Sequence, residues 1–246
     1  MTNKTNDRCV LLMPLLGSYH FDDEFEPVRD APLRYNNTLN CIRALRGIDL
    51  SRIQHIYFVI SESIDYMFSL SDIIKGDMKI LQRDSKENGM EIDELSYTIV
   101  KLKSDATYSP AETVYQAIQQ IGLEDCQILI KDGDNRIYIP NVPKYNFVAS
   151  YSLECCDLVD PMHKSYIKTD EQGYITNCIE RRVISDKFIA GMYSFRDVSL
   201  FIKAYEALNI TNQSFYVSDM IYWLILNTNE QFRPVDTRWF TDFNLE

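Results

Sequence analysis

The sequence lacks an excess of positive charge. Its 246 residues include 25 lysines and arginines against 36 aspartates and glutamates, which gives a formal net charge of −11. Because a nucleic-acid-binding protein neutralises phosphates with a basic face, this balance argues against a nucleic-acid partner. An acidic protein that handles phosphates needs metal ions or a few locally placed basic groups.

Cysteine pairs of the Cys-x-x-Cys kind are also absent. His55 and His163 have no partner at a recognisable spacing, and we assign them no role. Several cysteines fall inside apolar, strand-like stretches, which predicts reduced core residues in a cytoplasmic protein without a metal or catalytic role for the thiols. The six are Cys9, Cys41, Cys126, Cys155, Cys156 and Cys178.

No long hydrophobic run occurs. The first apolar stretch, Cys9 to Leu16, is broken by Pro14 and is too short to cross a membrane, and it has no signal-peptide cleavage pattern. We therefore expect no membrane partner. Apolar residues still make up 46% of the chain, which is enough for a substantial core in one large domain or two small ones.

Strand-like and helix-like stretches alternate as far as Asn135, which predicts βαβ units and a parallel sheet. We expect Asn36 or Asn37 to cap the first helix, Gly47 to end it, and the polar run 83–89 to form a surface loop. The apolar runs predicted to be buried strands are 9–13, 56–60, 95–102 and the run that ends at Ile130.

The remaining chain has a more antiparallel pattern. Asp170 to Gly173 has the composition of a hairpin turn, and two helices are predicted before the last strand. The predicted strands are 146–150, 156–159, 165–168, 174–179, 188–195 and 232–235. We expect a single domain over residues 1–246 with a mixed, mainly parallel sheet flanked by helices, in a Rossmann-like three-layer arrangement.

The stretch Ile130-Lys131-Asp132-Gly133-Asp134-Asn135 allows two interpretations. Ligands of open α/β sheets bind at the carboxyl ends of strands, and two carboxylates there can hold Mg²⁺, which brings phosphates with it. Asp, Gly and Asn are also the commonest turn residues, so a structural turn explains the pattern equally well. Ser109-Pro110-Ala111-Glu112-Thr113 has the spacing of a capping box that begins a helix, which Gly122 ends.

These features in this order resemble the sugar-phosphate nucleotidyltransferase family, whose fold is the GT-A type. Pro14 to Phe21 is similar to the family's nucleotide loop, and Ser109 to Thr113 is similar to its Gly-x-Ala-x-Thr segment. Asp132 to Asn135 matches the metal-binding Gly-Asp-Asn. Gly173 to Phe195 resembles the substrate-side pattern, and Val217-Ser218-Asp219 falls where the family has its second metal-binding aspartate. The halves 1–135 and 136–246 then correspond to the nucleotide and the acceptor.

The resemblance implies transfer of a nucleoside monophosphate from an NTP to a sugar phosphate or similar acceptor, with release of pyrophosphate, often to supply polysaccharides. Asp134 and Asp219 would hold Mg²⁺, with Asp132 beside it. The implied nucleotide-binding residues are Leu15, Leu16, Gly17, Ser18, His20, Ser109, Ala111, Thr113 and Asp132. The implied acceptor-binding residues are Glu180, Arg181, Gly191 and Tyr193.

The chain departs from the family on the basic side of the site. His20 stands where the loop has an arginine, and Ala31 stands in place of the catalytic lysine. Arg29 and Arg34 are the candidates for the missing charge, although a guanidinium fork does not reproduce an ammonium ion. Two alternatives therefore stay open. One is a metal-dependent glycosyltransferase that uses Asp132-Gly133-Asp134 as its Asp-x-Asp motif, and the other is a domain that binds a nucleotide without turnover.

Overall fold

The computed structural model describes residues 8–16, 20–21, 27–28, 34–35, 38–87, 95–103, 107, 109–156, 158–210 and 215–245. The predicted loop positions Gly17, Ser18 and Arg29 lie outside these residues, as do the proposed caps Asn36 and Asn37. For His20 and Arg34, only the backbone is described.

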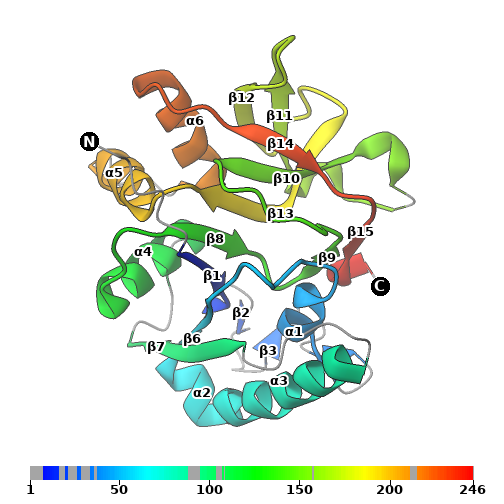
Figure 1. Ribbon diagram of the computed structural model, residues 1–246, viewed down its shortest axis with the longest axis vertical. Helices are drawn as coiled ribbons and strands as arrows, with labels where there is room; N and C mark the ends of the chain where they lie inside the picture. The colour runs from blue at the N-terminus through cyan, green and yellow to red at the C-terminus, as the bar shows by residue number, and fades with distance from the viewer. Residues whose placement is uncertain are drawn as a thin grey trace.

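The centre of the molecule is a nine-stranded mixed sheet (Figure 1). Its parallel part contains β7 (Ser96–Leu102), β6 (His55–Ser61), β1 (Cys9–Pro14) and β8 (Gln127–Lys131). The strands β6, β1 and β8 are buried and mostly apolar, as expected for parallel strands covered on both faces. The edge strand β7 is exposed at Ser96, Thr98 and Lys101. The apolar runs predicted near 9–13, 56–60, 95–102 and 130 are thus confirmed as strands.

The antiparallel part begins at β13 (Lys187–Phe195), which pairs with β8 and continues the sheet. From β13 the strand pairing continues along two branches. One leads through β11 (Ser165–Thr169) to β12 (Ile175–Glu180), and the other leads through β10 (Phe147–Ser152) to β14 (Arg233–Asp236). The spatial order of the strands along the main path of the sheet is β12-β11-β13-β8-β1-β6-β7.

Helices cover both faces of the sheet. Alternate residues of β1 separate the core into two clusters: Leu11 and Met13 contribute to one, and Val10 and Leu12 to the other. The first cluster contains α1 (Asn40–Leu45) and α3 (Leu70–Glu87), with α2 (Glu62–Phe68) at its end, and the second contains α4 (Pro110–Ile121), α5 (Val198–Asn209) and α6 (Val217–Asn227). The predicted mixed α/β sheet flanked by helices is therefore confirmed.

Short elements complete the described chain. Between β1 and α1, β2 (His20–Phe21) pairs with β3 (Pro27–Val28), and β4 (Arg34–Tyr35) pairs with β5 (Thr38–Leu39). Near the C-terminus, β15 (Phe240–Asp242) pairs with β9 (Asn135–Ile137), and the two lie side by side in Figure 1. The 3₁₀ turns are η2 (Leu153–Cys155), η3 (Pro161–His163) and η4 (Phe243–Leu245). The last segment of the chain thus contacts the turn that follows β8.

The local signals for α4 are confirmed. Ser109 is its N-cap and accepts a hydrogen bond from the Glu112 amide at 3.3 Å, Pro110 is the first helical residue, and Gly122 ends the helix at φ +71°. Only glycine adopts this φ without strain, which explains why the helix ends there.

Three local predictions are wrong. Residues 83–87 continue α3 instead of forming a loop, because Ile74, Met78 and Leu81 bury one face and leave a polar face to solvent. The stretch 156–159 forms no strand among its described residues. The first helix, α1, has Leu39 as its N-cap residue and not the predicted Asn36 or Asn37, and the Leu39 side chain makes no cap hydrogen bond.

Among the described residues, no helix combines the length and apolarity that a membrane span requires.

Candidate active site

The turn after β8 is held in place by Lys131. Its buried ammonium group donates hydrogen bonds to the backbone oxygens of Asp132 (2.7 Å) and Asn135 (3.0 Å) and to Oδ1 of Asn135 (2.7 Å). Burial lowers the pKa of Lys131 to about 8, while the nearby Asp132 and Asp134 act to raise it. A buried lysine that uses all three hydrogens within one turn stabilises a single turn geometry.

Asn135 connects the turn held by Lys131 to the side chain of Asp134. Its Nδ2 donates a hydrogen bond to Oδ1 of Asp134 at 2.9 Å, and Nδ2 of Asn244 lies 3.4 Å from Oδ2. The amide of Phe243 donates to the backbone oxygen of Asp134 at 2.9 Å. The exposed Asp134 carboxylate is therefore oriented by groups from two distant parts of the chain.

Gly191 allows β13 to approach this turn closely. It adopts φ +72°, and a Cβ at this position would lie 2.2 Å from Nδ2 of Asn135. Its backbone oxygen accepts a hydrogen bond from the Asp132 amide at 3.0 Å. The absence of a side chain at Gly191 is thus required by the position of Asn135, whatever role this glycine has toward an acceptor.

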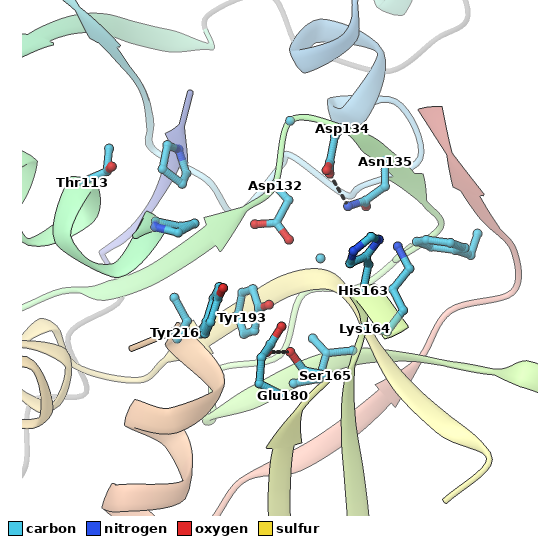
Figure 2. Close-up of a pocket in the computed structure, with 17 residues that line it drawn as sticks. Thr113, Asp132, Asp134, Asn135, His163, Lys164, Ser165, Glu180, Tyr193 and Tyr216 are labelled. Carbon is cyan, nitrogen blue, oxygen red and sulfur yellow. Dashed lines mark hydrogen bonds between the residues drawn. The ribbon is translucent and has the colours of Figure 1, made fainter. Parts of the chain in front are cut away.

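The turn borders a cavity of about 250 Å³ at the carboxyl end of β8. Figure 2 shows the Asp132 side chain pointing into it, with Thr113 of α4 on one side and His163 and Lys164 on the other. The residues that line the cavity are Pro14, Pro110, Thr113, Asp132, Gly133, Asp134, Asn135, His163, Lys164, Ser165, Glu180, Ile189, Gly191, Tyr193, Tyr216, Val217 and Phe240.

The Asp132 carboxylate receives no hydrogen bond from the described residues. Burial and the neighbouring Asp134 raise its pKa to about 6. Lys131 and Lys164 oppose this shift without cancelling it. A carboxylate that is partly buried, close to a second carboxylate and without a donor is a group that a cation would stabilise.

A third carboxylate, Glu180, lies across the cavity from the turn. Its Oε2 accepts hydrogen bonds from the hydroxyl groups of Ser165 and Ser218, the latter at 2.9 Å. Tyr193 lies near both Glu180 and Asp132 (Figure 2), and burial together with these carboxylates raises the pKa of its phenol well above the usual value. Tyr193 therefore stays neutral and can donate a hydrogen bond to a ligand.

Six predicted site residues lie at the cavity: Thr113, Asp132, Asp134, Glu180, Gly191 and Tyr193. Arg181 does not line it, because its exposed guanidinium lies over the Tyr216 ring at 5.5 Å. Asp219 does not line it either. Its Oδ2 accepts a hydrogen bond from the Tyr216 amide at 2.8 Å and so caps α6, the structural role that a helix N-terminal carboxylate often has.

The other predicted site residues with described side chains cap a helix or pack in the core. Ser109 caps α4, and Ala111 is fully buried beneath it. Leu15 packs under the turn, since a Cβ at Gly133 would lie 2.7 Å from its Cδ2, and Leu16 is buried in the core. The structure brings none of these four side chains to the cavity lining.

The sequence analysis missed several residues of the site. Lys131 could have been found as the one charged residue within a buried apolar strand. His163, Lys164 and Phe240 could not, because long-range pairing of β11 and β15 places them at the cavity.

The described residues contain no group of three or more His, Cys, Asp and Glu side chains arranged to hold a metal ion by themselves. Mg²⁺ usually binds through one or two protein carboxylates, with water and substrate phosphates completing its shell. Asp132 and Asp134 meet this requirement, because both line the cavity and Asp132 has no described donor. The residues present therefore fit a magnesium ion whose remaining ligands come from water or a bound phosphate.

No protein-family model matches the chain, and neither does any curated protein sequence. Solved structures do match. A nucleoside-diphosphate-sugar pyrophosphorylase from Vibrio cholerae has a TM-score of 0.66 at 12% identity over 96% of both chains. A UDP-glucose pyrophosphorylase complexed with UDP-glucose has a TM-score of 0.63 at 12% identity, over 96% of this chain and 93% of that one.

An inositol-1-phosphate CTP transferase from T. maritima has a TM-score of 0.62 at 12% identity, over 96% of this chain and 88% of the other. At this level of identity the likenesses establish a common fold. The fold implied by the sequence motifs, that of the nucleotidyltransferases, is thereby confirmed over nearly the whole chain.

Proposed function

We propose that this protein is a Mg²⁺-dependent nucleotidyltransferase that transfers a nucleoside monophosphate from an NTP to a phosphorylated small molecule. The observation that carries this proposal is the Asp132 carboxylate, which points into the cavity beside Asp134 without a described hydrogen-bond donor. The solved structures of the same fold that are named as pyrophosphorylases and as a CTP transferase support the class of reaction.

In the proposed reaction, a phosphate oxygen of the acceptor attacks the α-phosphorus of the NTP. A new P–O bond forms, the bond to the β-phosphate oxygen breaks, and pyrophosphate leaves with the electron pair. Asp132 and Asp134 would hold the ion, whose positive charge would offset the charge of the phosphates. Asp219 caps α6 and does not line the cavity, so the proposed ion site does not include it.

The protein's own side chains position the two substrates. Pro110 and Thr113 border the nucleotide side at the start of α4, where the positive end of the helix dipole favours a negatively charged ligand. Glu180 and Tyr193 border the acceptor side, where a carboxylate accepts and a neutral phenol donates hydrogen bonds to sugar-like hydroxyl groups. Catalysis then rests on positioning and charge neutralisation.

Pyrophosphate release tests the proposal. Each of the four NTPs is combined with Mg²⁺ and a panel of sugar 1-phosphates and other phosphate monoesters. Acceptor-dependent pyrophosphate with at least one pair supports the proposal. Hydrolysis of nucleotide-sugars without pyrophosphate release would instead support a glycosyltransferase, for which the Asp132-x-Asp134 pair at the cavity also provides the expected motif. Nucleotide binding without either reaction would contradict both activities.

Asp134→Asn provides the matched variant. We expect turnover to fall by about 100-fold or more, because an amide does not replace a carboxylate that holds the ion. Since Asp134 is exposed, the melting temperature should change by only about 2 °C. Glu171→Gln, the same charge change in an exposed hairpin turn, is the control. An unchanged rate in Asp134→Asn would show that this carboxylate holds no catalytic ion.

A further inference from the structure

The described part of the cavity lining is dominated by negative charge. It contains three carboxylates, those of Asp132, Asp134 and Glu180, and a single lysine or arginine, Lys164. Phosphorylated substrates repel carboxylates unless a cation lies between them. Under the proposed function, a divalent ion held by Asp132 and Asp134 would serve the nucleotide. The phosphate group of a second substrate needs a further positive group, and Lys164 is the described candidate.

Lys164 is held at the cavity by the C-terminal segment. Its Nζ lies 2.6 Å from Oδ2 of Asp242 and 5.1 Å from the centre of the Phe240 ring. The side chains of Lys164 and Asp242 are 15% and 8% exposed, so the ion pair is largely buried. Among the described residues, Asp242 accepts one N–H of the ammonium group, and the other two remain for a ligand.

Arg181 was the basic residue that the resemblance assigned to the acceptor. It is adjacent to Lys164, because its amide donates to the Lys164 backbone oxygen at 2.9 Å, but its guanidinium is exposed and stacked over Tyr216. Only Lys164 of the two lines the cavity. Lys164 also lies near enough to Asp132 to act on the charge of that carboxylate.

We infer that Lys164 binds the phosphate group of the second substrate, a phosphate monoester, and that Asp242 and Phe240 hold its ammonium group in position. The inference rests on the proposed function. An ammonium group binds the phosphates of an NTP as well as those of a monoester, so the position of Lys164 in the cavity has to distinguish the two ligands. Lys164 lies on the far side of Asp132 from Thr113 and the start of α4, which favours the acceptor (Figure 2).

Binding of inorganic phosphate, followed by ³¹P NMR line broadening, tests the inference without turnover. We expect Lys164→Met to raise the dissociation constant for phosphate about 10-fold or more, as loss of a charge-assisted hydrogen bond does. Lys168→Met removes the same charge from an exposed position of β11, the strand that follows Lys164, and should change the constant less than about 2-fold. Affinity for the NTP, measured separately, should stay within about 2-fold in Lys164→Met.

Lys164→Met leaves Asp242 buried without its partner and can destabilise the protein, so Lys164→Met/Asp242→Asn is measured beside it. The double variant removes both charges and should show the same loss of phosphate binding with an intact fold. Phosphate binding that depends on Arg181 but not on Lys164 would overturn the inference, as would equal losses for phosphate and NTP. Lys164-dependent phosphate binding without pyrophosphate release would contradict the proposed reaction and leave this binding role in place.

Discussion

Single side chains at the cavity, and Lys131 behind the turn that borders it, are held in environments where charge is costly. Burial lowers the pKa of Lys131 and raises those of Asp132 and Tyr193. Lys131 offsets this cost with three hydrogen bonds, but no described donor does so for Asp132. Under the proposed function, a cation held by this carboxylate would remove part of that cost, and perturbed groups of this kind are common at functional sites.

Asp132→Asn should stabilise the metal-free protein at neutral pH. Because the folded-state pKa of Asp132 is raised to about 6, above the value of about 4 in an unfolded chain, the native state binds this proton more tightly. Wild-type stability is then lost as pH rises from about 4 to 6. The variant cannot ionise here, so its free energy of unfolding should exceed that of wild type by about 2 kcal/mol more at pH 7 than at pH 4.

Urea unfolding at both pH values measures this difference, and Glu171→Gln again serves as the control. A variant that is less stable than wild type at pH 7 would show that the Asp132 carboxylate is favourably paired in the native protein.

Gly191→Ala should disturb the acidic turn. The new methyl group would meet Asn135 Nδ2 at 2.2 Å, and alanine is strained at φ +72°. Gly173→Ala is the matched control, because Gly173 also has positive φ, +80°, but its missing Cβ would meet no atom within 4 Å. We expect about 1 kcal/mol of strain in the control and at least about 2 kcal/mol in Gly191→Ala. Equal shifts in melting temperature would show that Asn135 moves aside freely.

At the scale of elements, the C-terminal segment closes the site. Strand β15 pairs with β9, and η4 places Phe243 in the core, where the Arg43 guanidinium lies 4.0 Å from its ring. The same segment supplies Asp242 to Lys164 and Asn244 to Asp134. The segment thus fixes the side chains of Lys164 and Asp134 at the cavity, and the buried Phe243 ring anchors the segment to the core.

Phe243→Ala tests that anchor. Removing a fully buried phenyl ring should lower the free energy of unfolding by about 3 kcal/mol or more. Hydrogen exchange of the backbone amide at position 243 should accelerate as β15 separates from β9. Leu245→Ala, at a residue 38% exposed, is the control and should cost less than about 1 kcal/mol. Slow exchange in Phe243→Ala would show that β15 holds its place without the ring.

At the scale of the whole molecule, the site lies where the parallel and antiparallel parts of the sheet meet. Strand β8 belongs to both, because it pairs with β1 on one edge and with β13 on the other. Its carboxyl end therefore faces the start of α4 on one side and β11 and β12 on the other. A cavity at such a junction can accommodate two different ligands, since each part of the sheet supplies one wall.

The sequence allowed prediction of what depends on neighbouring residues. The caps of α4, the strand before Asp132 and the hairpin turn at Asp170 all follow from local patterns, and the structure contains them. The ion pair of Lys164 and the contact of Asn244 with Asp134 could not be predicted, because their partners are 78 and 110 positions apart. Asp219 is a different case: the resemblance implied a metal ligand, whereas its carboxylate accepts a hydrogen bond from the Tyr216 amide, three residues away, and caps α6.

The pairing of β15 with β9 has a consequence for the order of folding. Closing a loop of about 110 residues costs roughly 4 kcal/mol of chain entropy before any contact repays it. Interactions between such remote segments form slowly compared with local helices. We therefore expect the acidic turn to acquire its final orientation late, after the sheet has assembled, so that a refolding chain recovers its compact core before it recovers a binding-competent cavity.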